Sequence, residues 1–395
     1  MSAIPVSARA RGITDSITLA ITARAKAMRA EGIDVVSLGA GEPDFPTAEP
    51  IADAGVQAIR DGYTRYTPAA GMPDVRQAGA DWFRRRFGLD FASEEIVVTA
   101  GAKPALSLAM QAIVNPGDKV LLPAPFWASY TDIVRLSDGV PVPLAAVPEQ
   151  GFVHTGEQIA EAIAETGAKG VVINFPNNPS GAVPTPAQVE AITDACAAAG
   201  VWIISDEIYA RLIYDGGEHA SPAGLAAGRD RTIVVNGGTK SHSMTGWRVG
   251  FLAAPAEIAA AVAKIASQAL GNTCSISQRA AKAMCEETDD TELHRRLAAF
   301  DERRRFLVES LDGHAGLAMP RPQGAFYALL DVREVCRERG IDDVAFAEQL
   351  LVDGRVATVP GTPFEIPGFV RLSYAASLDD LRLAVERIRS FVGDG

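Results

Sequence analysis

Long apolar runs are missing from this chain, and their absence excludes one broad class of protein. No apolar stretch reaches the about 18 residues that a membrane-spanning helix needs. Residues 1–9 also lack the apolar region of a secretory signal. We therefore expect a cytoplasmic protein that does not enter a membrane.

Cysteine is scarce as well. The cysteines are scattered along the chain, with no C-x-x-C pair and no adjacent histidine: Cys196, Cys274, Cys285 and Cys336. Such spacing favours neither a disulfide framework nor a zinc site. We expect buried thiols and no bound metal.

Positive charge is in deficit, since the formal net charge is −12. Runs of basic residues are confined to the arginines at 84–86 and 303–305, both in expected helices. An acidic chain without a broad basic surface is a poor partner for a phosphate backbone, so we expect no nucleic acid. The motifs G-x-G-x-x-G and G-x-x-x-x-G-K-[ST] are also absent after strands, which argues against dinucleotides and nucleoside triphosphates as ligands.

What the chain does have is length and apolar content. With 395 residues, 48% of them apolar, it can bury a large core in more than one domain. Between about residues 51 and 288, short β-branched runs alternate with alanine-rich helical stretches, which predicts an α/β fold with a mainly parallel sheet. The expected strands lie at 95–99, 119–122, 170–174, 201–205, 232–235 and 249–253.

The terminal regions follow a different pattern. A helix at 16–31 and a strand at 35–38 come first, and a long helix at 291–311 follows the α/β region. Short strands at 325–330, 356–359 and 369–373 and a helix at 378–392 complete the chain. We predict a large domain from 46–288 and a smaller α+β domain from 1–45 and 289–395.

Lys240 is the most informative single residue. It lies in a turn rich in Gly, Ser and Thr just after the strand at 232–235, and open α/β sheets bind ligands at the carboxyl ends of their strands. A lysine amine attacks carbonyl groups once burial or a neighbouring cation lowers its pKa. Arg248 can supply that charge or hold a phosphate.

Other loops after expected strands also carry polar or aromatic groups. Gly101, Ala102 and Lys103 open a helix at 104–114, where free N–H groups bind phosphate, although an ordinary βα turn has the same pattern. Asp206 follows the strand at 201–205 and needs a partner there, either an arginine or a protonated ring nitrogen. Trp127 can stack on a planar ligand or fill the core.

The remaining candidate groups are amides and a guanidinium. The stretch FPNNPSG at 175–181 places two asparagines between prolines, and their amides should face a ligand. Arg371 lies in an apolar strand, where it can bind a carboxylate ligand or form a structural ion pair. Amine, phosphate turn, aromatic, acid and arginine together meet the needs of pyridoxal phosphate bound to an amino acid.

With these motifs, the chain resembles the class I (aspartate aminotransferase-like) family of fold-type I pyridoxal-phosphate enzymes over essentially its whole length. The motifs occur in the family's order: GAGEPDF at 39–45, YTPAAG at 66–71, PNNPSG at 176–181, SDEIY at 205–209, TKS to TGWR at 239–248 and RLSY at 371–374. The resemblance implies a large domain with a mainly parallel seven-stranded sheet flanked by helices, plus the smaller domain.

The resemblance also implies roles for the cofactor residues. Lys240 would hold pyridoxal 5'-phosphate as a Schiff base and would shuttle the substrate proton, and Asp206 would keep the pyridine nitrogen protonated. Asn178 and Tyr209 would bond the phenolic oxygen. The remaining cofactor contacts would be Trp127 on the ring and, on the phosphate, Gly101, Ala102, Lys103, Thr239, Arg248 and, from the neighbouring subunit, Tyr66. A homodimer with shared active sites is therefore implied.

The resemblance also implies which residues would bind the substrate. Arg371 would bind the α-carboxylate, helped by Gly41 and Asn178, with Trp127 alongside. Lys103, with Ser16 and Thr18, would favour an acidic substrate side chain, although Ser16 and Thr18 equally suit simple helix capping.

The activity implied is transamination from aspartate to 2-oxoglutarate in a ping-pong cycle, which gives oxaloacetate and glutamate. Relatives with nearly the same motifs use prephenate as acceptor, so an aspartate/prephenate aminotransferase is the alternative. A further hypothesis is a lyase or cyclising synthase with the same fold. A non-catalytic effector domain of a transcription regulator is not expected, because the chain begins about where the enzyme domain does.

Overall fold

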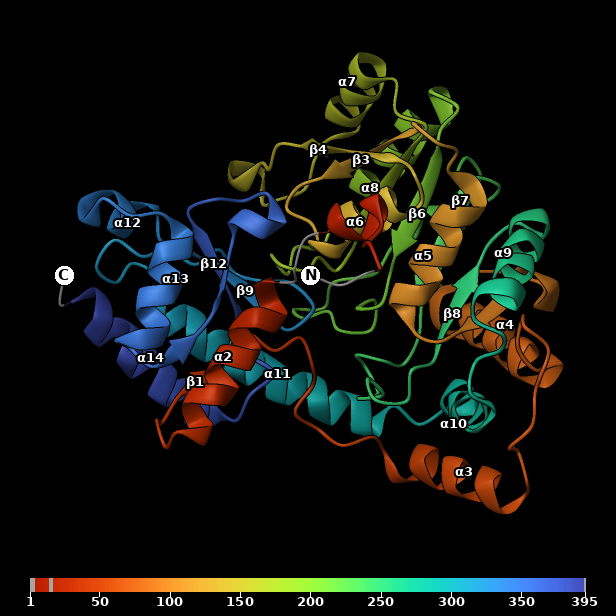
Figure 1. The fold of residues 1–395 in the computed structure, drawn as a ribbon, viewed down its shortest axis with the longest axis horizontal. Coiled ribbons are helices and arrows are strands. Elements are labelled where there is room, and N and C mark those ends of the chain that lie inside the picture. The colour runs from red at the N-terminus through yellow and green to blue at the C-terminus, as the bar shows by residue number, and fades with distance from the viewer. Residues whose placement is uncertain (1–3, 14–16, 394–395) are drawn as a thin grey trace.

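A large sheet lies at the centre of the computed structural model, which describes residues 4–13 and 17–393. Its strand order is β2-β8-β7-β6-β5-β3-β4 (Figure 1). The strands are β2 (Ile96–Thr99), β3 (Lys119–Pro123), β4 (Val140–Leu144), β5 (Gly170–Asn174), β6 (Trp202–Asp206), β7 (Thr232–Asn236) and β8 (Gly250–Ala253). Only β8 runs antiparallel to its neighbours, β2 and β7, so the predicted mainly parallel α/β sheet is confirmed.

Strand β4 was missed by the sequence analysis. It contains Pro141 and Pro143, and proline lacks the N–H that a central strand must donate. The structure places β4 at the sheet edge, paired only with β3, where one side of the strand needs no partner. The strand expected at 95–99 is also shorter than predicted, because Glu95 ends the 3₁₀ turn η1 (Ser93–Glu95).

Helices cover both faces of this sheet because successive strand residues point to opposite sides. Leu122 and Val172 pack on the side of α5 (Ala102–Ile113), α6 (Ser129–Leu136) and α9 (Ala256–Ala269). Leu121 and Val171 pack on the opposite side, against α7 (Gly156–Thr166) and α8 (Pro186–Ala198). At the β2 end, the second face is covered by α4 (Pro73–Phe87) and α10 (Ser275–Glu286), and α3 (Glu49–Arg60) packs on α10.

The two ends of the chain lie together in a second region. Strand β1 (Val36–Ser37) pairs in parallel with β10 (Val356–Ala357), and α2 (Ile17–Ala30) contacts both. In Figure 1 the red α2 lies beside the blue C-terminal helices. A three-stranded antiparallel sheet has the order β11-β12-β9. The remaining elements of this region are β9 (Tyr327–Asp331), β11 (Val359–Pro360), β12 (Phe369–Ser373), α11 (Thr291–Leu311), α12 (Arg333–Arg339), α13 (Asp343–Val352) and α14 (Leu378–Val392). The short helix α1 (Ala8–Arg11) lies apart from it, near the end of α6, where Arg9 pairs with Asp138.

One expected strand is divided in this region. The run predicted at 356–359 breaks at Thr358, so its first half belongs to the β1 pair and its second half to the antiparallel sheet. The domain limits at 45/46 and 288/289 stay a prediction.

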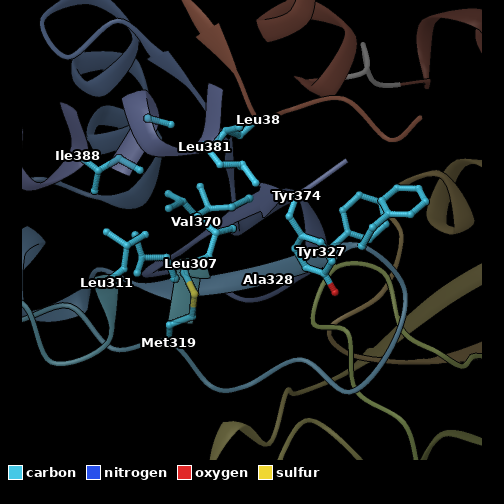
Figure 2. Packing of buried hydrophobic residues seen from close by; sticks show 14 of the residues in the cluster. Leu38, Leu307, Leu311, Met319, Tyr327, Ala328, Val370, Tyr374, Leu381 and Ile388 are labelled. Carbon is cyan, nitrogen blue, oxygen red and sulfur yellow. The ribbon is translucent and has the colours of Figure 1, made fainter. Parts of the chain in front are cut away.

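One apolar core joins β9, β12, α11 and α14 of the second region. Leu307 of α11, Val370 of β12 and Ile388 of α14 belong to it (Figure 2). The same cluster contains Ile208 and Tyr209, which directly follow β6 of the large sheet. The carboxyl edge of the large sheet therefore lies against the second region.

Two negative findings apply to the described ranges. None of their helices is long and apolar enough to cross a membrane. Their His, Cys, Asp and Glu side chains form no group of three or more that could hold a metal ion.

Candidate functional site

Strand direction determines which loops meet at the carboxyl edge of the large sheet. Strands β2, β3, β5, β6 and β7 end there, and β8 begins there because it runs the opposite way. Thr99, the last residue of β2, pairs with Gly250, the first residue of β8. The register therefore brings Arg248, just before β8, next to the turn that follows β2.

That turn forms a cradle for an anion. Gly101 precedes α5 with φ +105°, and a Cβ at this position would lie 2.8 Å from Arg248 Nη2. Only glycine lets the guanidinium lie against the turn. The first N–H groups of α5 have no carbonyl partner within the helix, so they can bind an anion together with Arg248. Thr239, which is buried, donates from Oγ1 to Val249 O at 3.4 Å.

Lys240 points from its loop toward the loop that follows β1. Its Nζ donates to Gly41 O at 2.5 Å and lies 5.9 Å from the centre of the Tyr209 ring. The pKa of Lys240 is lowered to about 8, mainly by burial. Arg371 and Arg248 contribute to this shift, whereas Glu42 and Asp206 oppose it. Arg248 is thus one neighbouring cation, as expected, but burial is the main cause. Near neutral pH this amine is partly deprotonated and nucleophilic.

Asp206 is the last residue of β6 and is almost fully buried. Tyr130 Oη donates to its Oδ2 at 2.7 Å, and the Ile208 N–H donates to its Oδ1 at 3.3 Å. Burial raises the pKa of Asp206 to about 6, and these hydrogen bonds and Lys240 limit that rise. No arginine pairs with this carboxylate in the described part of the chain, which argues against the first of the two partners considered from the sequence.

The two asparagines at 177 and 178 have different surroundings. Asn177 Nδ2 donates to Pro125 O at 3.0 Å, and its Oδ1 accepts from the N–H and hydroxyl of Ser180. Asn177 therefore holds its own loop together, contrary to the expectation that both amides face a ligand. Asn178 instead accepts at Oδ1 from Arg371 Nη1 at 2.9 Å.

Arg371 extends from β12 into the same space. It is 2% exposed, and its Nη2 donates to Gly39 O at 2.8 Å. Its Nε has no hydrogen-bond partner among the residues that the structure describes. Within 4–13 and 17–393 no carboxylate forms an ion pair with it, which argues against the structural ion pair considered from the sequence. A buried guanidinium without a counter-ion is a ready partner for a carboxylate ligand.

Tyr327 was not predicted as a site residue, yet it links several groups there. Its hydroxyl lies 3.0 Å from that of Tyr209, and its ring lies 4.5 Å from the Arg371 guanidinium carbon. A Cβ at Gly41 would come within 2.7 Å of the same hydroxyl, which explains the glycine. Tyr327 lies at the start of an apolar strand, so nothing in the local pattern separates it from core aromatics.

Trp127 and Lys103 lie side by side at the edge of the site. Lys103 Nζ is 4.7 Å from the Trp127 ring centre and donates to Ser129 Oγ at 3.1 Å. The residue is exposed, but partial desolvation of its ammonium group and the nearby Arg248 lower the pKa of Lys103. Tyr66 is 97% exposed. Ser16 and the Thr18 side chain lie outside the described part of the structure.

Several known proteins that are similar in sequence and fold are named as aminotransferases. An aspartate aminotransferase from Bacillus sp. (strain YM-2) is 43% identical over 387 residues, covering 97% of this chain and 98% of the relative. An aspartate/prephenate aminotransferase from Thermus thermophilus is 41% identical and covers 98% and 99%. The solved structure of aspartate aminotransferase from Thermus thermophilus with maleate has a TM-score of 0.93, 40% identity and coverage of 98% and 99%.

The family profile gives the same result. The family described as aminotransferase class I and II matches residues 33–388, which contain Lys240, Asp206 and Arg371. The chain belongs to the class I and II aminotransferases.

Proposed function

We propose that this aminotransferase uses pyridoxal 5'-phosphate and transfers the amino group of aspartate to 2-oxoglutarate. The observation that carries the proposal is the surroundings of Lys240, whose pKa is lowered to about 8. The Asp206 carboxylate and the Arg371 guanidinium both lie close enough to influence the charge of this amine, and no carboxylate within residues 4–13 and 17–393 pairs with Arg371. Nucleophile, acid and carboxylate receptor are thus gathered around one space.

The residues present suit this cofactor. The turn at Gly101 places the Arg248 guanidinium beside the start of α5, where free N–H groups and a positive charge together suit a phosphate. Asp206 is suited to a protonated ring nitrogen because its carboxylate is buried and, among the described residues, no cationic side chain is in direct contact with it. Trp127 is half-buried beside this space and can stack on a planar ring.

When bound, pyridoxal phosphate withdraws electrons from the substrate Cα. Lys240 would attach the cofactor through Nζ and later move the Cα proton, a task that suits an amine of pKa near neutrality. Asp206 would hold the proton on the ring nitrogen. The Tyr209 hydroxyl and the amide nitrogen of Asn178 would donate to the phenolic oxygen, since Asn178 Oδ1 is already engaged by Arg371.

Arg371 would bind the substrate α-carboxylate and thereby orient Cα toward Lys240. Its Nη1 and Nη2 are held by Asn178 and Gly39, so the guanidinium is fixed before the substrate arrives. Gly41 and Trp127 would line the same position. The ring of Tyr327 supports the guanidinium from one face.

Aspartate is the preferred donor in this proposal because Lys103 adds a positive charge at the edge of the site. The names of the relatives are consistent with a dicarboxylic substrate. Ser16 and Thr18 would assist Lys103. A relative is named as an aspartate/prephenate enzyme, so prephenate is the second candidate acceptor.

Steady-state assays of the purified protein test the proposal. We expect aspartate to be the best amino donor, with 2-oxoglutarate accepted faster than prephenate. Rapid transamination of prephenate would favour the second candidate. Negligible activity with aspartate beside a fast alternative donor would contradict the donor assignment. Formation of pyruvate, ammonia or a cyclic product without an acceptor would instead indicate a lyase or synthase.

Lys103→Ser tests the basis of substrate choice. Loss of one charge should raise the KM for aspartate and 2-oxoglutarate about tenfold, the effect expected of a partly exposed ion pair with a ligand. The kcat/KM for alanine should change little, because alanine has no second carboxylate. Lys119→Ser, at an exposed lysine that bonds Thr166 O, serves as control. An equal loss with alanine would assign Lys103 to the phosphate alone.

We also infer a homodimer with shared active sites. Tyr66 is 97% exposed, which suits a residue that reaches a neighbouring subunit. Val56 and Ile59 of α3 are apolar and exposed as well, and such residues are commonly covered in oligomers. Sedimentation velocity measures the state directly, and a monomer at micromolar concentration would contradict it.

A further inference from the structure

Tyr130 makes the shorter of the two hydrogen bonds recorded for the Asp206 carboxylate, although nothing in the sequence marks it. It lies in the first turn of α6, 76 residues before Asp206, and its Oη donates to Asp206 Oδ2 at 2.7 Å. Both side chains are buried, at 2% and 4% exposure. The other carboxylate oxygen accepts only the longer contact from the Ile208 N–H, at 3.3 Å. The tyrosine hydroxyl is therefore the stronger constraint on the carboxylate.

Tyr130 is also tied to Trp127. Its backbone N–H donates to Trp127 O at 2.9 Å, and the two rings meet edge to face with centres 5.5 Å apart. Because α6 begins just after Trp127, one rigid segment carries both the aromatic wall and the donor to Asp206. A tyrosine here links the ends of β3 and β6.

The groups around Asp206 have opposing effects on the charge of its carboxylate, and a hydrogen-bond donor favours the charged form. The pKa of Asp206 is raised to about 6, mainly by burial and to a smaller extent by the neighbouring carboxylate of Glu207. The Tyr130 hydrogen bond, the Ile208 N–H and Lys240 act in the opposite direction. Tyr209 also faces this group, and its own pKa is raised well above the usual range by burial.

Tyr130 can act as a donor throughout the neutral range. Burial and the nearby Asp206 raise the pKa of Tyr130 well above its usual value, so the hydroxyl keeps its proton. A neutral hydroxyl that donates to a carboxylate stabilises the charged form of the acid. Its loss would leave one carboxylate oxygen buried without a side-chain partner.

We propose that Tyr130 is a positioning residue that keeps the Asp206 carboxylate charged and fixed in one orientation for the ring nitrogen of the cofactor. This inference rests on the proposed function, since it requires that pyridoxal phosphate binds against Asp206. Tyr130 would act on the cofactor through Asp206 and would not contact the substrate.

The test is Tyr130→Phe, which removes the hydroxyl and keeps the ring against Trp127. Titration of the apoprotein with pyridoxal phosphate, followed by absorbance, should give a Kd raised about tenfold at pH 7, because a hydrogen bond to a buried charge is lost. The difference should shrink toward pH 9, where Asp206 ionises even without the donor. With ¹⁵N-labelled cofactor, the ring-nitrogen resonance should shift toward the unprotonated position at pH 7.

Matched variants separate this role from packing. Tyr214→Phe deletes another buried hydroxyl, one that donates to Ala325 O, and should leave the ring-nitrogen resonance and its pH dependence unchanged. In the Asp206→Asn background, Tyr130→Phe should have no further effect on cofactor affinity. An undiminished effect in that background would overturn the proposal.

Other outcomes are also decisive. An unchanged Kd and an unchanged nitrogen resonance in folded Tyr130→Phe would show that the hydroxyl serves packing only. If Tyr130→Phe does not fold, para-aminophenylalanine in place of Tyr130 supplies an N–H donor at the position of the hydroxyl. A Kd and a ring-nitrogen resonance equal to those of the parent protein would then support the proposal. A shifted resonance would oppose it. A parent protein that binds no pyridoxal phosphate would refute the proposed function itself, which is a different result.

Discussion

Lys240→Ala should abolish transamination, with kcat lower by at least about 10³-fold, because a positioned acid–base group alone contributes about 10²- to 10⁴-fold. The same change removes the proposed attachment point of the cofactor. Borohydride treatment of the parent holoenzyme followed by peptide mapping should find the pyridoxyl group on the peptide that contains Lys240. The exposed Lys264 offers a control, and Lys264→Ala should retain both activity and labelling. A pyridoxyl group on any other lysine would contradict the assignment.

The lowered pKa of Lys240 adds a pH dependence. An ordinary lysine is only ~0.03% neutral at pH 7, whereas an amine of pKa about 8 is ~10% neutral there. Because only the neutral amine attacks, attachment of pyridoxal phosphate to the apoprotein should accelerate with pH and level off above about 8. Stopped-flow absorbance measures this rate. A rate still rising steeply above pH 10 would mean that the amine is not buried in solution.

Local sequence signals identified the residues whose chemistry depends on their place in the chain. Lys240, Asp206 and the turn at Gly101 follow apolar β-branched runs directly, so the rule that ligands gather at strand ends located them. Arg371 was found because a charge is unusual in an apolar strand. For each of these residues, the neighbouring sequence alone indicates the structural environment of the side chain.

Residues whose position depends on tertiary packing gave no such signal. Tyr130 lies in an amphipathic helix and Tyr327 in an apolar strand, where aromatic residues are ordinary core components. Their hydroxyls acquire a role only because the fold brings distant residues, Asp206 and Tyr209, within hydrogen-bond distance. Strand β4 was missed for a related reason, since its prolines are acceptable only at a sheet edge and edge position is a property of the whole sheet.

Arg371→Met should raise the KM for amino and oxo acids together and lower kcat/KM by about 30- to 5,000-fold. The estimate corresponds to the about 2–5 kcal/mol lost when one partner of a buried hydrogen-bonded charge pair is removed. The loss should be similar for aspartate and alanine, because the α-carboxylate is common to both. Steady-state kinetics with the two donors measures it.

Thermal unfolding then distinguishes a ligand receptor from a structural arginine. Arg371→Met removes hydrogen bonds to Asn178 and Gly39 but also removes a buried charge that no carboxylate compensates, so the two effects oppose each other and the Tm of the apoprotein should change little. Arg304 is the matched control, since it is equally buried but paired with Asp215 and Asp301. Arg304→Met should lower the Tm by several degrees because Asp215, Asp301 and Pro322 O lose their hydrogen bonds to this buried guanidinium, although Arg321 and Arg305 still pair with the two carboxylates. The opposite order of Tm values would make Arg371 a structural residue and would leave the substrate carboxylate without its proposed receptor.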